Sequence, residues 1–196
     1  MIRRIILPAI TLVALAACSS TPARYYTLSS VPPQTAAAPA SGLSIAVAPV
    51  TLPEGVDRFE LVVRTADNRV DILDSDRWAE PLRQDIARVV ADDLAQRLPA
   101  ARIAAYPQYA SRDAAYTVFI DVQRFESTTT TATLDARWTL RREDDKQTQY
   151  GRETISESIT GGNAGLAAAH SRALGRLADV VASTIRSNTG APVVRP

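Results

Sequence analysis

The sequence predicts a single α+β domain, in which a mostly antiparallel sheet forms one layer and two amphipathic helices form the other. Three observations support this fold class. Short segments with alternating apolar and polar residues are joined by brief turns, which is typical of antiparallel strands. Two longer segments instead repeat apolar residues at helical spacing. With 196 residues, 46% hydrophobic and 22% charged, the chain has the composition of one globular domain.

The first half of the predicted domain, which as a whole spans residues 43–187, contains three strands and a helix. Its expected elements are strands over residues 43–50, 59–65 and 69–73, followed by a helix over residues 81–98. Pro49 ends the first strand, because proline cannot donate a ladder hydrogen bond. Pro81 suits the first position of the helix, where its missing N–H costs nothing, and Pro99 stops the same helix.

The second half continues with strands and closes with a long helix. Its expected elements are strands over residues 102–106, 116–123, 132–140 and 150–160, followed by a helix over residues 164–187. Residues 132–140 show the strictest alternation in the chain, with apolar residues at every second position. His170 falls at the margin of the last helix's apolar stripe, so we expect a structural or surface role for it outside the core.

An export signal precedes the domain. Arg3 and Arg4 are followed by an apolar run over residues 5–15, which is shorter than the about 20 residues of a membrane-spanning helix. Residues 1–17 are therefore predicted to be a signal peptide. The segment Leu15-Ala16-Ala17-Cys18 resembles a bacterial lipobox, which implies that Cys18 is lipidated and becomes the first residue of the mature chain. The alternative is an ordinary cleavage site followed by a chance cysteine.

Two features bear on where the lipidated chain would reside. Ser19, rather than Asp, follows the cysteine, and resemblance to the Gram-negative lipoprotein sorting rule implies the outer membrane. The chain has no large excess of charge, so attachment to the membrane would depend on the lipid alone.

Residues 18–42 are expected to be a lipidated N-terminus and a tether rich in Pro, Ala and Ser, and residues 188–196 a flexible tail. Tyr25, Tyr26 and Leu28 interrupt the tether with side chains that are costly to leave in water. One interpretation is a short strand that pairs with the domain's own sheet. The other is a segment that docks on a neighbouring subunit or a partner, which makes these three residues candidate partner contacts.

The residue inventory argues against several classes of function. One Cys and one His rule out an intramolecular disulfide and nearly exclude a protein-only metal or haem site, so no cofactor is expected. Lys and Arg total 22 and Asp and Glu 21, which lacks the basic excess of a nucleic-acid-binding protein. No catalytic motif occurs, so we expect no enzyme. The acidic pair Asp92-Asp93 is interpreted as solvated surface opposite the helix's apolar face.

Trp78 stands just before the first helix, within the segment Asp-Arg-Trp-Ala-Glu-Pro-Leu. Two interpretations stay open for it. It caps the hydrophobic core, or it anchors a partner interface, where tryptophan is favoured.

Taken together, the lipobox, the Tyr-Tyr-Thr-Leu segment, the Asp-Arg-Trp-Ala-Glu-Pro-Leu segment and the strand Thr-Val-Phe-Ile-Asp-Val-Gln-Arg-Phe carry a resemblance. The sequence resembles the auxiliary lipoproteins of MCE-type ABC transport systems, the PqiC-like family, over roughly residues 15–140. The final helix matches this family only in type.

The resemblance implies a non-enzymatic outer-membrane lipoprotein that faces the periplasm. It implies a partner, an MCE-domain protein reaching out from an inner-membrane complex, in a system that moves lipid or guards envelope integrity. It further implies a homo-oligomer. The alternative function is a structural envelope lipoprotein that assists assembly of an outer-membrane protein.

Overall fold

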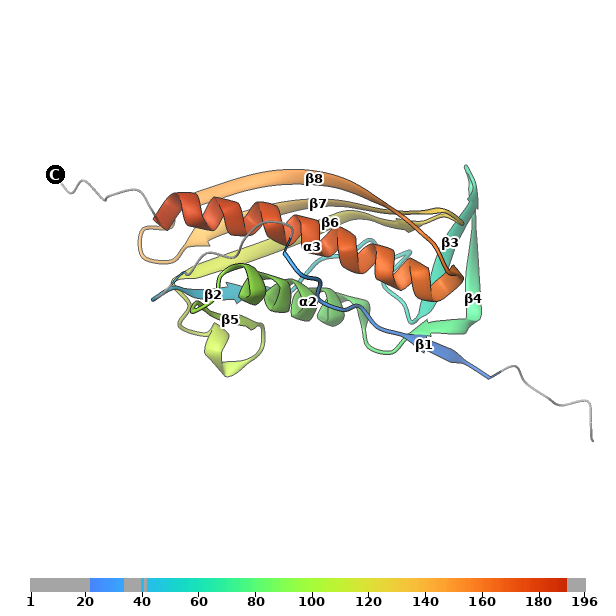
Figure 1. Cartoon of the computed structure of the whole chain (residues 1–196), viewed down its shortest axis with the longest axis horizontal. Coiled ribbons are helices and arrows are strands. Elements are labelled where there is room, and N and C mark those ends of the chain that lie inside the picture. The colour runs from blue at the N-terminus through green and yellow to red at the C-terminus, as the bar shows by residue number, and fades with distance from the viewer. Residues whose placement is uncertain (1–21, 34–39, 41, 190–196) are drawn as a thin grey trace, which may run out of the picture.

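The computed structural model describes residues 22–33, 40 and 42–189. Two helices lie against one face of a sheet, and a hairpin stands across one end of that sheet (Figure 1). The chain enters at the hairpin end, where its first strand lies, and the last helix runs toward the opposite end. This arrangement gives the two predicted layers and adds a second, smaller sheet.

The helices and strands have well-defined bounds. They are β1 (Arg24–Tyr26), β2 (Ser44–Val47), β3 (Glu60–Ala66), β4 (Arg69–Trp78), α2 (Leu82–Arg97), β5 (Arg102–Ala105), the 3-10 turn η3 (Tyr109–Ser111), β6 (Tyr116–Ser127), β7 (Thr131–Arg142), β8 (Thr148–Ser158) and α3 (Gly162–Thr189).

Two sheets share the strands. The larger has five strands in the order β5-β2-β6-β7-β8, and the smaller has three in the order β1-β4-β3. The α+β class is confirmed, and the antiparallel pairing expected from short turns holds for β3–β4, β6–β7 and β7–β8. The sheets are mixed, because β2 runs parallel to both β5 and β6, and β1 runs parallel to β4. These parallel neighbours are joined by long connections, as parallel pairing requires.

The core lies between the larger sheet and the two helices. Its fully buried members include Ile45, Ile86, Leu94, Leu134, Leu140, Leu174 and Leu177. Helix α3 contacts α2, β7 and β8, so it is covered on more than one side. Many of its core-facing residues are alanines, which let these neighbours approach closely.

Several element ends differ from the expected ones, and α3 begins at Gly162 rather than at residue 164. Strand β4 continues to Trp78 rather than ending at residue 73, and a register shift between Glu60 and Leu61 marks the bend in the hairpin. Pro81 precedes the first residue of α2 instead of occupying it. Gly161 and Gly162 have φ of +87° and +68°, a conformation that favours glycine, and they turn the chain from β8 into α3.

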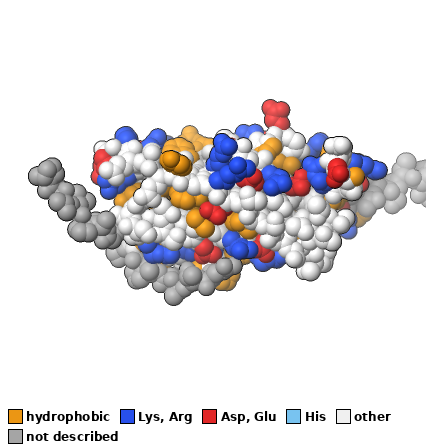
Figure 2. Space-filling view, turned by 90° about the horizontal axis from the view of Figure 1, so that it is seen from above, with side chains coloured by type: hydrophobic (Ala, Val, Ile, Leu, Met, Phe, Trp, Pro, Cys, Tyr) orange, Lys and Arg blue, Asp and Glu red, His pale blue; other side chains and the backbone are white. Residues whose placement is uncertain are grey.

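Charged side chains of both signs cover the surface. On the face shown in Figure 2, basic and acidic groups lie side by side. Arg69 with Asp71 on β4, and Arg142 at the end of β7 with Asp144 in the following turn, are examples of exposed pairs. Exposed pairs of this kind contribute little to stability.

Candidate functional site

The N-terminal segment, residues 22–33, is built into the domain. Its strand β1 forms a parallel pair with β4 and so becomes an edge of the smaller sheet. We expected a tether over residues 18–42, and the described part of that range corrects this expectation and moves the start of the domain before residue 43. The physical reason is that alternate side chains in this stretch are large and apolar, and the domain offers a surface that buries them.

The three aromatic and aliphatic residues of this segment have different surroundings. Leu28 is 1% exposed and belongs to the core. Tyr26 is half-buried, and its hydroxyl donates a hydrogen bond to Asp76 Oδ1 at 2.6 Å. Tyr25 points the other way and is 65% exposed. Of the two interpretations, the segment therefore pairs with the domain's own sheet, and Tyr25 is the most exposed of the three residues.

Asp76 binds strand β1 through an ion pair as well as through hydrogen bonds. Its carboxylate also accepts from Arg24 Nη2 at 2.8 Å. Burial acts to raise the pKa of Asp76, but the hydrogen bonds from Arg24 and Tyr26 outweigh it and lower that pKa. The same carboxylate raises the pKa of Tyr26 by accepting its proton in a hydrogen bond. Asp76 is therefore ionised and Tyr26 neutral at neutral pH.

Beyond β1 the N-terminal segment crosses both helices and has no strand beside it. Its backbone is instead bound by helix side chains, which satisfies groups that burial would otherwise leave unpaired. Three of its amides donate to such side chains: Leu28 N to Asp85 Oδ2 (2.9 Å), Ser29 N to Ser171 Oγ (3.1 Å) and Val31 N to Asp93 Oδ1 (2.8 Å).

A buried arginine lies beneath this segment. Arg97 is 2% exposed, and its Nε donates to Asp179 Oδ1 at 2.7 Å while Nη1 donates to Val31 O at 3.2 Å. Its Nη2 donates to Gly175 O at 2.8 Å. Gly175 lets the segment lie this close, because a Cβ added there would stand 2.1 Å from Val31 Cγ2. Arg97 thus joins α2, α3 and the N-terminal segment.

Asp93 corrects the prediction of a solvated acidic pair. Asp92 is exposed, whereas Asp93 is 0% exposed and shares Arg97 with Asp179. Burial raises the pKa of Asp93 to about 6, against the opposing effect of the Val31 amide and Arg97. One oxygen of Asp93 and one of Asp179 have no hydrogen-bond partner. The cluster therefore holds two carboxylates for one guanidinium, which favours retention of a proton.

The sequence contained part of the signal for these contacts. Asp85 and Asp93 are eight residues apart, so they lie on one face of α2. The stripe that α2 buries includes its neighbours Ile86 and Val90. Carboxylates beside an apolar stripe indicate backbone or cationic partners, but the partners themselves come from remote segments.

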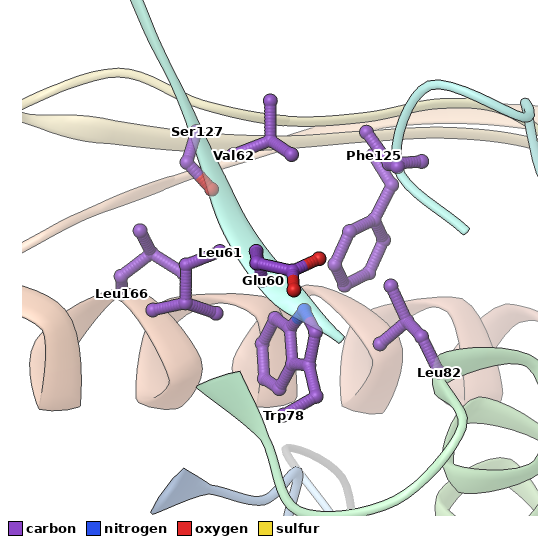
Figure 3. Close-up of a pocket in the computed structure, with 9 residues that line it drawn as sticks. Glu60, Leu61, Val62, Trp78, Leu82, Phe125, Ser127 and Leu166 are labelled. Atoms are coloured by element: carbon purple, nitrogen blue, oxygen red, sulfur yellow. The ribbon is translucent and has the colours of Figure 1, made fainter. Parts of the chain in front are cut away.

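Trp78 lies in the core. It is 4% exposed, and its ring meets Phe125 edge to face with centroids 6.3 Å apart. Figure 3 shows Trp78 below a water-sized pocket, with Leu82 and Phe125 on one side and Leu166 on the other. The core position matches the first of the two interpretations of Trp78, and a side chain so enclosed presents no surface to a partner.

His170 is also buried, which corrects its expected place at the margin of the helix's apolar stripe. It is 0% exposed and stacks on Phe125 with ring centroids 3.7 Å apart. Its Nε2 lies 2.9 Å from Ser127 Oγ, and its Nδ1 has no hydrogen-bond partner. Burial lowers the pKa of His170 to about 3, so the ring is neutral near pH 7. A general base needs a pKa near the working pH, so this buried pair is suited to packing.

Three expectations remain, which concern the lipidated cysteine, metal binding and membrane-spanning helices. Cys18 lies outside the described residues. Within residues 22–33, 40 and 42–189, no cluster of three or more His, Cys, Asp or Glu is arranged to hold a metal ion. Over the same residues, neither helix has the length and hydropathy to cross a membrane.

Comparison with known proteins adds to this geometry. A family model described as "ABC-type transport auxiliary lipoprotein component" matches residues 26–182. Protein XCC0632 from Xanthomonas campestris has a similar structure, with a TM-score of 0.69 and 19% identity over 86% of this chain and 100% of that chain. A structure described as that of an uncharacterized protein has a TM-score of 0.69 and 18% identity over 84% of this chain and 99% of that chain. Both likenesses show a shared fold. No curated protein sequence matches the chain at significant similarity.

Proposed function

The chain belongs to the ABC-type transport auxiliary lipoprotein family, and we propose that it is an outer-membrane lipoprotein that faces the periplasm and docks an MCE-type transporter. In this function Cys18 carries the lipid, and the domain binds an MCE-domain protein that reaches out from the inner membrane. The system moves lipid or maintains the envelope. The observation that carries this proposal is the family match over residues 26–182, which includes nearly the whole described domain.

The geometry of the N-terminal segment supports the anchoring part of the proposal. Residue 22 follows Cys18 by four positions, a distance of at most about 14 Å along the chain. From Arg24 onward the chain is bound by Asp76 and the two helices. A lipid on Cys18 would therefore hold the hairpin end of the domain close to the membrane surface. The opposite end, where α3 finishes, would face away from it.

The candidate partner contacts follow from the same arrangement. Tyr25 lies on the exposed side of β1, and its aromatic ring suits an interface. Leu28 and Trp78 are buried, so neither offers a contact surface of its own. We propose that Tyr25 contributes to a contact between neighbouring copies or with the MCE-domain protein. The neutral, buried His170 supports the further proposal that the domain binds partners and catalyses no reaction.

The anchor is tested by membrane fractionation of two adjacent substitutions. Cys18→Ser should release the chain from the membrane fraction or leave its signal peptide uncleaved. Ser19→Asp should keep the chain membrane-bound but retain it in the inner membrane, whereas Ser20→Ala, the matched control, should fractionate like the parent. Outer-membrane recovery of Cys18→Ser would overturn the lipid anchor.

The partner is tested by affinity purification of the parent after chemical cross-linking in intact cells. Recovery of a protein with MCE domains is the expected result. Recovery of an outer-membrane barrel protein in its place would favour the assembly function instead.

A further inference from the structure

A groove opens between the β3–β4 hairpin and the end of β6. It has a volume of about 290 Å³. Five of its ten lining residues are apolar: Pro53, Val56, Val62, Val70 and Phe125. Four of its lining residues also line the water-sized pocket above Trp78 in Figure 3, so the groove adjoins the core (Val56, Val62, Phe125 and Ser127). We call this feature the hairpin groove.

The hairpin groove leaves apolar surface in water. Val70 is 46% exposed on its wall, although a valine side chain gains free energy when it is buried. Ile72, two residues further along the same strand, is 43% exposed but does not line the groove. Exposed apolar walls that converge on a concave surface are typical of a binding site.

The polar groups at the hairpin groove carry a net positive charge. Arg64 donates to Glu126 Oε2 at 2.5 Å and to Asp67 O at 2.8 Å, so its charge is paired. Arg124 is exposed and follows a register shift in β6, where a bulge re-aims side chains. Within the described residues its guanidinium makes no side-chain hydrogen bond or ion pair, though its charge contributes to the lowered pKa of its cross-strand neighbour Asp135. Two arginines and one glutamate give the lining residues a net charge of +1.

We propose that the hairpin groove binds one acyl chain whose end carries a singly charged anionic head group. The apolar walls would receive the chain, and Arg124 would pair with the carboxylate or phosphodiester at its end. The groove's volume is close to about 300 Å³, the lower end of the range for small-ligand pockets. A groove of this size suits one acyl chain and is too small for a helix of a partner protein.

This inference deepens the proposed function by naming an amphiphile that the domain itself contacts. It rests on the proposed function only for the role of that contact in transport. A free fatty acid and a membrane phospholipid share this chemistry, so the experiment must tell the two sources apart.

The test is native mass spectrometry of the full lipidated chain, released from a non-ionic detergent. Palmitic acid, phosphatidylglycerol and uncharged hexadecanol are added separately, and the mass of each adduct identifies what is bound. Val70→Glu places a negative charge on the groove wall, and Ile72→Glu is its matched control on the same strand. Arg124→Gln removes the positive charge proposed to meet the head group, and Arg102→Gln, at an exposed arginine on β5, is its control.

The parent should form an adduct with palmitic acid, phosphatidylglycerol or both, and the heavier adduct identifies a phospholipid source. Val70→Glu and Arg124→Gln should each weaken that adduct by about tenfold, whereas Ile72→Glu and Arg102→Gln should bind like the parent. Because Val70 and Arg124 are exposed, these variants should melt at the parent's temperature. If Val70→Glu fails to fold, Arg124→Gln alone decides the outcome.

Three results would overturn the inference: no adduct with either anionic lipid, equal adducts in parent and Arg124→Gln, or hexadecanol bound as well as palmitic acid. None of these results bears on Cys18 fractionation or on MCE capture. The groove and the proposed function therefore fail separately.

Discussion

Leu28 provides the sharpest test of how the N-terminal segment is attached. The substitution Leu28→Ala removes a side chain that is 1% exposed, in a segment whose composition is that of a tether. If the segment were only a spacer, the change would have no effect on the folded domain. Because Leu28 belongs to the hydrophobic core, we expect a substantial loss of stability.

The size of that loss follows from core substitutions in general. Replacing a buried leucine with alanine costs about 3–5 kcal/mol, through lost burial and the cavity left behind. The segment is held mainly by hydrogen bonds and lies at the surface of the helices, so it can partly collapse into the space. We therefore expect about 3 kcal/mol. At about 2–4 °C per kcal/mol for a chain of this size, the melting temperature should fall by about 6–12 °C.

Thermal unfolding followed by circular dichroism measures this change on the purified full chain. Tyr25→Ala is the matched control, because Tyr25 lies three residues earlier in the same N-terminal segment but is 65% exposed, and its loss should cost less than about 0.5 kcal/mol. The control's melting temperature should fall by no more than about 2 °C. If Leu28→Ala also melts within about 2 °C of the parent, the conclusion that the segment is packed into the core is refuted.

Three further substitutions test other buried contacts. His170→Ala should destabilise by about 3 kcal/mol in chemical denaturation, because it removes a ring stacked on Phe125; a loss below about 1 kcal/mol would place it outside the core. The pKa of Asp93 is raised from 3.8 to about 6, so protonation of Asp93 stabilises the fold. This stabilisation is fully present below pH 3.8 and is lost as the pH rises through 6. The pKa of His170, lowered to about 3, acts oppositely, since stability falls as the pH drops below 6.5. Asp93→Asn should therefore lose on the order of 1–2 kcal/mol from pH 8 to 5 while the parent changes less, and identical melting profiles would contradict this. A glycine-to-alanine change in a helix usually stabilises by about 1 kcal/mol. Gly175→Ala should instead destabilise the protein, because the added methyl group would collide with Val31. A raised melting temperature would disprove that contact.

The sequence by itself determined the strands, the helices and the fold class. Strict alternation located β7, and helical spacing located α2 and α3. These are local signals, because each depends on residues within about four positions of one another. The family resemblance was equally accessible, and the match over residues 26–182 confirms it.

The tertiary structure alone decided the burial of Leu28, Asp93 and His170, and His170 is covered by Phe125 of β6. An amphipathic pattern shows which face of a helix meets one neighbouring layer, but α2 and α3 are covered by a second neighbour. That neighbour is the N-terminal segment, and its contact between Val31 and Asp93 joins residues 62 positions apart. Arg97 and Asp179, 82 positions apart, meet beneath the same segment. Such contacts depend on where remote parts of the chain meet in space, and no periodicity along the sequence contains that information.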